Sequence, residues 1–475
     1  MASSRAQSDP NYPRFHVAPP VGRLNDPNGL VLKDGTYHVF YQFGPFFPDR
    51  KPIYWGHATS TDLVNWTTHD PALAPNDWYD RNGVYSGGAT IDGDTVWLHY
   101  TGNVKNEDGT RGSYQSAATT RDFKTFEKVD ANPLISTPVP GYTAHVRDPF
   151  VVPDGDGFTM YLGAQREDET GCVLVYSSPN LTDWKPEGES EVAPPPDGRS
   201  GYEDFGFMWE CPNVLRLPDE ETGEVFDVLI MSAQGIPAQE AQFRNIFACG
   251  YVVGHLDGTR FEPTSEFTEL DNGFEFYGPQ VFTTDEVGSA PLLMGWVGNA
   301  SEDGQPSLKD FGWVHALTVP RELTLRGGRL HQEPKLGLDL EPLAIRGAEL
   351  DEVGAAIAEL EGVRSFVLSL AVRQRGDWHL VLGKAGGPHV SLEFAPGTLT
   401  VDRSSTHYPH GERRFVPVPD QEVLDVTVIH DRSVTEVFVG GGEVAFSMRS
   451  YLDPDGFNVA VAGDATVEQA RYAAP

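Results

Sequence analysis

The sequence predicts an all-β protein, a five-bladed β-propeller followed by a C-terminal β-sandwich. Three observations support this prediction: a turn motif that recurs about every sixty residues, apolar strand-like runs between Gly- and Pro-rich turns, and a change of composition after Leu336. The chain has 475 residues, including Gly 50 and Pro 37. Because this length exceeds what one hydrophobic core usually supports, we expect two domains.

The recurrent motif predicts the propeller. A small polar pair, an Asp or Asn, an apolar residue and an aromatic recur in TSTDLVNW, TTRDFKTF and SSPNLTDW, and more loosely in GHLDGTRF; these copies end at Trp66, Phe126, Trp184 and Phe261. Each copy follows a strand-like segment, and self-similarity on this scale is typical of four-stranded blades. Residues 15–335 have room for five blades. On pattern alone, a β-sandwich or an irregular β domain is the alternative.

The composition also predicts where the propeller ends. We assign residues 1–335 to the propeller and 336–352, which are richer in Ala, Leu and Glu, to a linker. In residues 353–475, apolar side chains such as Phe366 and Leu368 alternate with polar ones, as half-buried strands require. Short alternating strands joined by turns predict a β-sandwich there.

Charge and composition exclude several classes of partner. The net charge of −34 argues against a nucleic-acid backbone or an anionic membrane as partner. Cys172, Cys211 and Cys249 are too scattered for a disulfide framework or a zinc site. The N-terminal residues lack an apolar signal region, and no apolar run is long enough to span a membrane. We expect a cytoplasmic protein, with homo-oligomerisation left open.

One distinctive polar element occurs in each predicted blade. Asp26, Ser86, Asp148, Glu210 and Tyr277 follow one another at intervals of 60 to 67 residues. Equivalent positions of successive blades surround the central axis, so these side chains should converge at one end of the channel. Like charges brought together raise at least one pKa, which suits cleavage of a glycosidic bond by paired carboxylates. Structural turns repeated in phase are the alternative explanation.

At these residues the chain resembles glycoside hydrolase family 32, the β-fructofuranosidases. The motifs that carry the resemblance occur in the family's order along the whole chain: NDPNG, FYQF, WGHATSTDLVNW, YSGG, RDPF, ECPN and GFEFYGPQ. The resemblance implies a five-bladed propeller, a C-terminal β-sandwich and retention of configuration. It also implies that Asp26 is the nucleophile, Glu210 the acid/base and Asp148 the transition-state stabiliser. In a retaining site the nucleophile and acid/base lie about 5–5.5 Å apart.

Further residues are expected to shape the fructose subsite. Those that can hydrogen-bond sugar hydroxyls are Asn25, Gln42, Ser86 and Arg147. We also expect Arg147 to keep Asp148 ionised. Those that can form apolar or stacking walls are Trp55, Tyr85, Tyr277 and Trp296. For each aromatic taken singly, ordinary core packing is the alternative.

The leading hypothesis is an exo-acting, retaining β-fructosidase that uses sucrose or a related fructoside. Trimming of fructans or fructo-oligosaccharides and fructosyl transfer are alternatives, because transfer uses the same intermediate. A non-catalytic carbohydrate-binding propeller is an alternative from a different class. A third alternative is an arabinan- or xylan-directed five-bladed hydrolase, but that hypothesis does not explain why NDPNG and ECPN occur together. We expect no metal or cofactor, since the mechanism needs none. The sequence leaves a preference for a 6-phosphate open.

Overall fold

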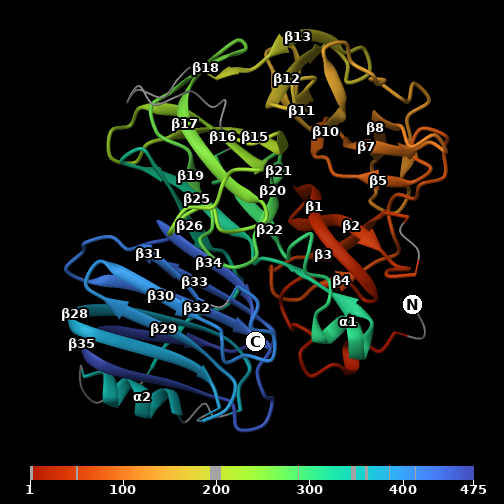
Figure 1. Cartoon of the computed structure of the whole chain (residues 1–475). Coiled ribbons are helices and arrows are strands. Elements are labelled where there is room, and N and C mark those ends of the chain that lie inside the picture. The colour runs from red at the N-terminus through yellow and green to blue at the C-terminus, as the bar shows by residue number, and fades with distance from the viewer. Residues whose placement is uncertain are drawn as a thin grey trace.

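The computed structural model describes residues 4–49, 52–192, 205–286, 288–343, 349–358, 362–384, 386–411 and 413–475. Within these ranges, five successive sheets surround a central axis, and a larger C-terminal sheet lies beside them (Figure 1). The predicted all-β fold, a five-bladed propeller followed by a sandwich region, is therefore confirmed.

The first three blades follow chain order, with the first strand of each nearest the axis. Blade 1 contains β1 (Gly22–Lys33), β2 (Thr36–Gly44), β3 (Tyr54–Ser60) and β4 (Thr67–Thr68). Blade 2 contains β5 (Gly83–Tyr85), β6 (Ala89–Asp92), β7 (Thr95–Lys105), β8 (Arg111–Thr120) and β9 (Glu127–Lys128). Blade 3 contains β10 (Tyr142–Asp154), β11 (Gly157–Arg166), β12 (Gly171–Ser178) and β13 (Lys185–Glu189).

The last two blades complete the ring. Blade 4 contains β14 (Glu191–Val192), β15 (Met208–Pro218), β16 (Val225–Gln234), β17 (Ala248–Asp257), β18 (Arg260–Pro263) and β19 (Thr268–Glu269). Blade 5 contains β20 (Tyr277–Val281), β22 (Leu292–Val297), β24 (Ala316–Leu317), β25 (Arg321–Arg326) and β26 (Arg329–Pro334). Two short strands, β21 (Thr283–Thr284) and β23 (Trp313–Val314), pair in parallel with β1. These pairings join the end of the propeller to its first blade.

The repeated motif is a hydrogen-bonded turn between the last two strands of blades 1 to 3. In the first copy, the Ser60 hydroxyl accepts the Leu63 N–H (2.8 Å) and Asp62 Oδ1 accepts the Val64 N–H (2.9 Å). Leu63, Phe123 and Leu181 occupy the same place in their copies, and all have positive φ. The looser copy over residues 254–261 instead spans the β17–β18 hairpin. The sequence period thus reports a structural turn on the outer side of each of these blades.

The C-terminal region is one sheet folded over its own apolar face. It contains β27 (Glu341–Pro342), β28 (Ser365–Gly383), β29 (His389–Ala395), β30 (Thr398–Asp402), β31 (Arg413–Pro417), β32 (Leu424–Asp431), β33 (Val434–Val439), β34 (Val444–Arg449) and β35 (Asn458–Ala473). The first half of β28 pairs with β32 and the second half with β29, while β35 pairs along its whole length. A register shift between Gln374 and Trp378 marks the bend.

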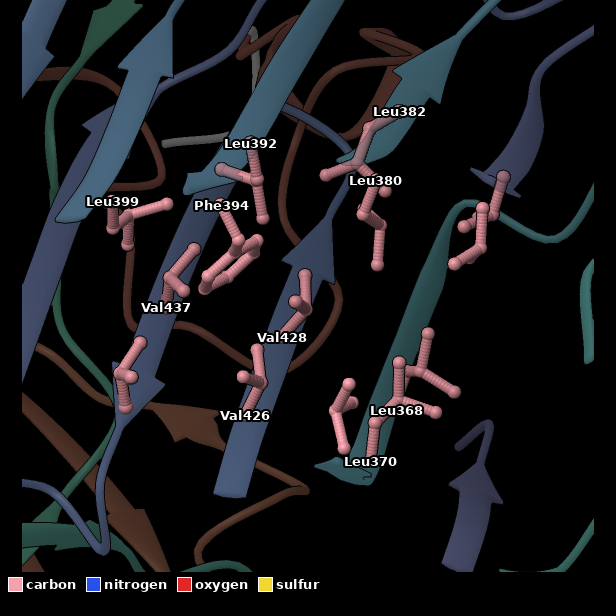
Figure 2. Close-up of a cluster of buried hydrophobic side chains, with 14 of the residues drawn as sticks. Leu368, Leu370, Leu380, Leu382, Leu392, Phe394, Leu399, Val426, Val428 and Val437 are labelled. Atoms are coloured by element: carbon pink, nitrogen blue, oxygen red, sulfur yellow. The ribbon is translucent and has the colours of Figure 1, made fainter. Parts of the chain in front are cut away.

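The layers of this region enclose a hydrophobic core (Figure 2). Leu368 from the first half of β28 and Leu380 from its second half both belong to the core, as do Phe394 and Val428 on the strands that pair with these halves. The helix α2 (Leu350–Ala358) contributes Val353 to the same cluster. The remaining helices, η1 (Ala6–Ser8) and α1 (Pro306–Phe311), lie in the propeller part of the chain.

Candidate active site

The innermost strands of four blades carry a bulge just where the predicted site residues lie. In each, two residues of the inner strand face one residue of the next strand, with the register shifts between Leu24 and Pro27, Arg147 and Phe150, Glu210 and Asn213, and Tyr277 and Gln280. A bulge disrupts the ladder locally and re-aims side chains, and bulges are common beside active sites. The repeated polar element is therefore a repeated bulge at one end of the channel.

A proline follows this element in the four bulged strands and sharpens the predicted alignment of the blades. Aligned on the proline, one position holds Asn25, Arg147, Glu210 and Tyr277, and the next holds Asp26, Asp148, Cys211 and Gly278. Glu210 thus lies one position earlier in its blade than the two aspartates in theirs. Position 278 requires a glycine, because its φ is +53° and a Cβ there would lie 3.0 Å from Asp26 Cγ.

Asp26 is held through one of its two carboxylate oxygens. The Ser86 hydroxyl donates to Oδ2 at 2.6 Å, and the Gln42 amide donates to the same oxygen at 3.0 Å. Oδ1 has only a long contact, 3.3 Å, from the Asn25 amide. Burial raises the pKa of Asp26, the Ser86 hydrogen bond opposes that rise, and the charge of Glu210 adds to it. Asp26 therefore presents one weakly engaged oxygen.

Asp148 lies deeper and is only 3% exposed. The Cys211 backbone N–H donates to its Oδ2 at 3.2 Å, and its own N–H donates to the Thr101 hydroxyl at 2.9 Å. Burial and the charge of Glu210 raise the pKa of Asp148, while the Arg147 charge lowers it. The result is a buried carboxyl group held from the bulge of the neighbouring blade.

Glu210 is engaged at both oxygens. Arg147 donates to Oε1 through Nε at 2.8 Å and lies 2.7 Å from it through Nη2. The Gln234 amide and the Tyr277 hydroxyl each donate to Oε2 at 2.5 Å. The guanidinium of Arg147 thus binds Glu210 directly, whereas we expected it to serve Asp148; its effect on Asp148 is through charge alone.

The predicted aromatic residues differ in what they can offer a ligand. Trp55 is 0% exposed, and its indole N–H donates to the Tyr85 carbonyl at 3.0 Å. Trp55 therefore holds the backbone of Tyr85 and presents no surface to a sugar. Tyr85 is half-buried, Tyr277 reaches Glu210 through its hydroxyl, and the Trp296 ring lies under a guanidinium.

That guanidinium belongs to Arg23, which sequence reasoning missed. Arg23 donates from Nη1 to Asn25 Oδ1 at 2.7 Å and from Nε to Asp303 Oδ1 at 2.7 Å, and it lies 5.1 Å from the Trp296 ring. Gln234 and Thr101 were missed as well. Only Arg23 could have been found from the sequence, since it lies three residues before Asp26. Gln234 and Thr101 come from strands that are distant in the sequence from the acidic residues they contact.

Together, these contacts bring the three carboxylates to one end of the channel. Asp26 and Glu210 are partly exposed, whereas Asp148 is buried beside them. Two accessible carboxylates with separate partners can act as an attacking and a proton-donating group. In the described ranges, no group of three or more His, Cys, Asp or Glu side chains is arranged to hold a metal ion. Likewise, no helix of the described chain has the length and apolar character to cross a bilayer.

Two family domains match the chain almost end to end. The N-terminal domain of the glycosyl hydrolases family 32 matches residues 16–334, and the C-terminal domain of the same family matches residues 338–473. The first match covers the blades that contain the carboxylates, and the second covers the sandwich region.

Individual relatives agree with this assignment. A sucrose-6-phosphate hydrolase of Bacillus subtilis is 36% identical over 458 residues, which is 96% of this chain and 92% of the relative. A raffinose invertase of Escherichia coli is 35% identical over 460 residues, 94% of this chain and 90% of the relative. The structure of a Lactobacillus gasseri sucrose-6-phosphate hydrolase superposes with a TM-score of 0.84 at 26% identity, covering 99% of this chain and 94% of that one. The chain is a member of glycoside hydrolase family 32, a β-fructofuranosidase that hydrolyses sucrose-type fructosides.

Proposed function

We propose that Asp26 is the nucleophile, Glu210 the acid/base and Asp148 the transition-state stabiliser of this hydrolysis. The observation that supports the proposal is the convergence of the three carboxylates from three blades, each with its own hydrogen-bond partners. Asp26 has an oxygen free to attack, Glu210 is held by groups that orient it, and Asp148 is buried. These are three different environments for one functional group, which is how carboxylates acquire different roles.

In the first step, Asp26 Oδ1 attacks the anomeric carbon of the fructosyl unit. The bond from that carbon to the glycosidic oxygen breaks, and protonated Glu210 gives its proton to the departing oxygen. The product is a fructosyl ester of Asp26 and a free alcohol. Ser86 and Gln42 keep Oδ2 turned away, so that Oδ1 is the attacking atom.

In the second step, ionised Glu210 takes a proton from water as the water oxygen attacks the anomeric carbon. The ester bond breaks, Asp26 leaves as a carboxylate, and fructose is released with its configuration retained. Asp148 accepts hydrogen bonds from sugar hydroxyls while the ring gains oxocarbenium character. Asn25, one residue before the nucleophile, and the Tyr85 ring border the same space.

We also propose that the leaving sugar carries a phosphate, so that the substrate is sucrose 6-phosphate. The relatives named above that are sucrose-6-phosphate hydrolases support this choice. A charged disaccharide crosses a bilayer poorly, which makes a cytoplasmic location part of the same proposal. Self-association stays a prediction.

A product profile tests the proposal. The enzyme is incubated with sucrose 6-phosphate, sucrose, inulin and levan, and free fructose is measured against the released partner. We expect equal amounts of fructose and glucose 6-phosphate from the phosphorylated substrate, with the β anomer of fructose appearing first. Fructose well below glucose 6-phosphate would contradict hydrolysis in favour of fructosyl transfer. Initial release of the α anomer would contradict the double displacement.

A further inference from the structure

Three hydrogen-bond donors at the rim of the site have no acceptor among the described residues. They are the Arg111 guanidinium, the Nε2 of His145 and the hydroxyl of Tyr85, for none of which a protein partner lies within hydrogen-bonding distance in the described chain. Tyr85 precedes Ser86, and His145 lies two residues before Arg147. Tyr85 and His145 thus lie beside the groups that hold Asp26 and Glu210.

The strand geometry brings Arg111 toward this rim. In β8, Ser113 donates to the Ala144 carbonyl at 2.6 Å and Gln115 donates to the Val146 carbonyl at 2.8 Å. Alternate residues of a strand share a face, so Arg111 begins the same face that these two residues direct at β10. Burial and the charges of Arg147 and Arg111 together lower the pKa of His145. Arg111 is therefore within electrostatic reach of His145.

The hydrogen bonds of His145 fix which ring nitrogen carries its proton. Arg147 Nη1 lies 2.7 Å from His145 Nδ1, and a guanidinium can only donate. Nδ1 therefore accepts, and the proton of the neutral ring is on Nε2. This leaves Nε2–H as a donor on the side of the ring opposite Arg147, whose other nitrogens hold Glu210. The unpaired donors thus lie next to the acid/base, where the leaving group departs.

The chemistry of these donors suits a phosphate monoester. A guanidinium offers a planar fork to phosphate oxygens, and hydrogen bonds from charged groups to phosphate are about twice as strong as neutral ones. An exposed cation without a carboxylate partner is notable in a chain of net charge −34. A sugar hydroxyl would leave most of the donors of Arg111 unused.

We infer that Arg111, His145 and Tyr85 bind the 6-phosphate of the leaving glucosyl group and so select the phosphorylated substrate. The inference rests on the proposed function, because that function places the leaving group beside Glu210. It goes further by naming the specificity-determining residues. A phosphate bound there would also hold the Nε2 proton of His145 and thereby keep Nδ1 as the acceptor for Arg147.

The test compares two substrates in the full-length enzyme and an Arg111→Gln variant. The readout is the ratio of kcat/KM for sucrose 6-phosphate to kcat/KM for sucrose. We expect this ratio to fall at least about tenfold in the variant, mainly through a higher KM, because a charge-assisted hydrogen bond is lost. The control is Arg216→Gln, whose side chain is 76% exposed on β15, and it should keep the wild-type ratio.

A second arm uses inorganic phosphate as the probe. Phosphate should inhibit sucrose hydrolysis competitively in the wild type and in Arg216→Gln, and much more weakly in Arg111→Gln. If the wild type prefers sucrose 6-phosphate and Arg111→Gln keeps the same ratio, the inference is overturned while the proposed function stands. Wild-type enzyme that prefers unphosphorylated sucrose would overturn both the inference and the proposed substrate, but not the hydrolytic activity. Wild-type enzyme that hydrolyses neither sugar would instead refute the proposed function itself.

Discussion

Two clusters of acidic residues in this molecule differ in how their charges are paired with cations. One is the active-site cluster of Asp26, Asp148 and Glu210. The other, which we call the interdomain network, joins the propeller to the sandwich region and consists of His16, Asp271, Arg321, Asp431 and Glu436.

In the interdomain network every carboxylate has a cation. Arg321 Nη2 lies 2.9 Å from Asp271 Oδ2 and 2.6 Å from Glu436 Oε2. His16 links Asp431 at 2.9 Å to Glu436 at 3.0 Å. Asp431 also accepts the backbone N–H groups of residues 14–16. Although burial raises the pKa of Asp431, the His16 hydrogen bond and charge lower it to about 2.

In the active-site cluster, Glu210 is the only carboxylate with an ion pair among the described residues, and its partner is Arg147. The charge of Arg23 lowers the pKa of Asp26 without forming an ion pair with it. Burial raises the pKa of Asp26 and Asp148, which have no ion-pair partner among the described residues. Burial also raises the pKa of Asp271 in the interdomain network, but there the charge of its partner Arg321 opposes the rise. A buried charge without a partner costs stability, and removing one partner of a buried pair leaves such a charge behind. The active-site cluster therefore differs from the interdomain network in that Asp26 and Asp148 lack the ion pairs that every carboxylate of the network has, as far as the described residues show.

The largest expected effect separates the clusters by activity. Asp26→Asn replaces the carboxylate that we propose as the nucleophile and should lower kcat by at least about 1,000-fold. Initial rates with sucrose and its 6-phosphate measure this, and circular dichroism checks the fold. The control is Asp94→Asn, an exposed turn residue between β6 and β7. Turnover within tenfold of wild type would show that Asp26 is not the nucleophile.

The second effect concerns stability. Arg321→Leu leaves Asp271 buried without a cation and Glu436 with His16 alone, and it should lower the free energy of unfolding by about 3–5 kcal/mol. Urea denaturation measures the change. Arg326→Leu is the control, since Arg326 lies on the same strand but forms exposed ion pairs worth about 0–1 kcal/mol. Equal destabilisation by both variants would remove the distinction between the network and the surface.

The network also predicts a dependence on pH. Burial lowers the pKa of His16, but its hydrogen bonds to Asp431 and Glu436 raise it overall from 6.5 to about 9. A raised histidine pKa contributes stability that is complete below pH 6.5 and is lost as the pH rises through 9. Unfolding temperatures of wild type should therefore fall between pH 6 and pH 9.5, and His16→Gln should flatten this fall. A parallel fall in both proteins would contradict the assignment.

The smallest expected effect is a gain in stability rather than a loss. Asp148 has a raised pKa when folded, so its ionisation lowers stability as the pH rises above 3.8, the value of the unfolded residue. Asp148→Asn should therefore be inactive yet melt slightly higher than wild type at pH 7, with the difference vanishing near pH 3.5. An Asn variant that melts lower at pH 7 would mean that the charge of Asp148 is compensated after all.

The sequence predicted the fold and the three carboxylates because both repeat with the blades. It did not predict the one-residue offset of Glu210, since a bulge is a property of strand register. Arg23 and Asp303 are 280 residues apart in the sequence, so no local sequence pattern predicts their contact. The interdomain network was not predicted for a similar reason. Asp431 and Glu436 lie in an apolar strand pair, and the sequence around them does not indicate which residues they contact.

We propose that Asp26 carries the fructosyl group while Glu210 transfers the proton, and trapping the covalent intermediate tests both roles. A Glu210→Gln variant is mixed with β-fructofuranosyl fluoride, whose leaving group needs no protonation, and the protein is analysed by intact mass and peptide mapping. The first step should proceed and the second should stall, since no base activates water. We predict a mass increase of one fructosyl unit on the peptide that contains Asp26. No adduct during turnover, or an adduct on another residue, would contradict the account.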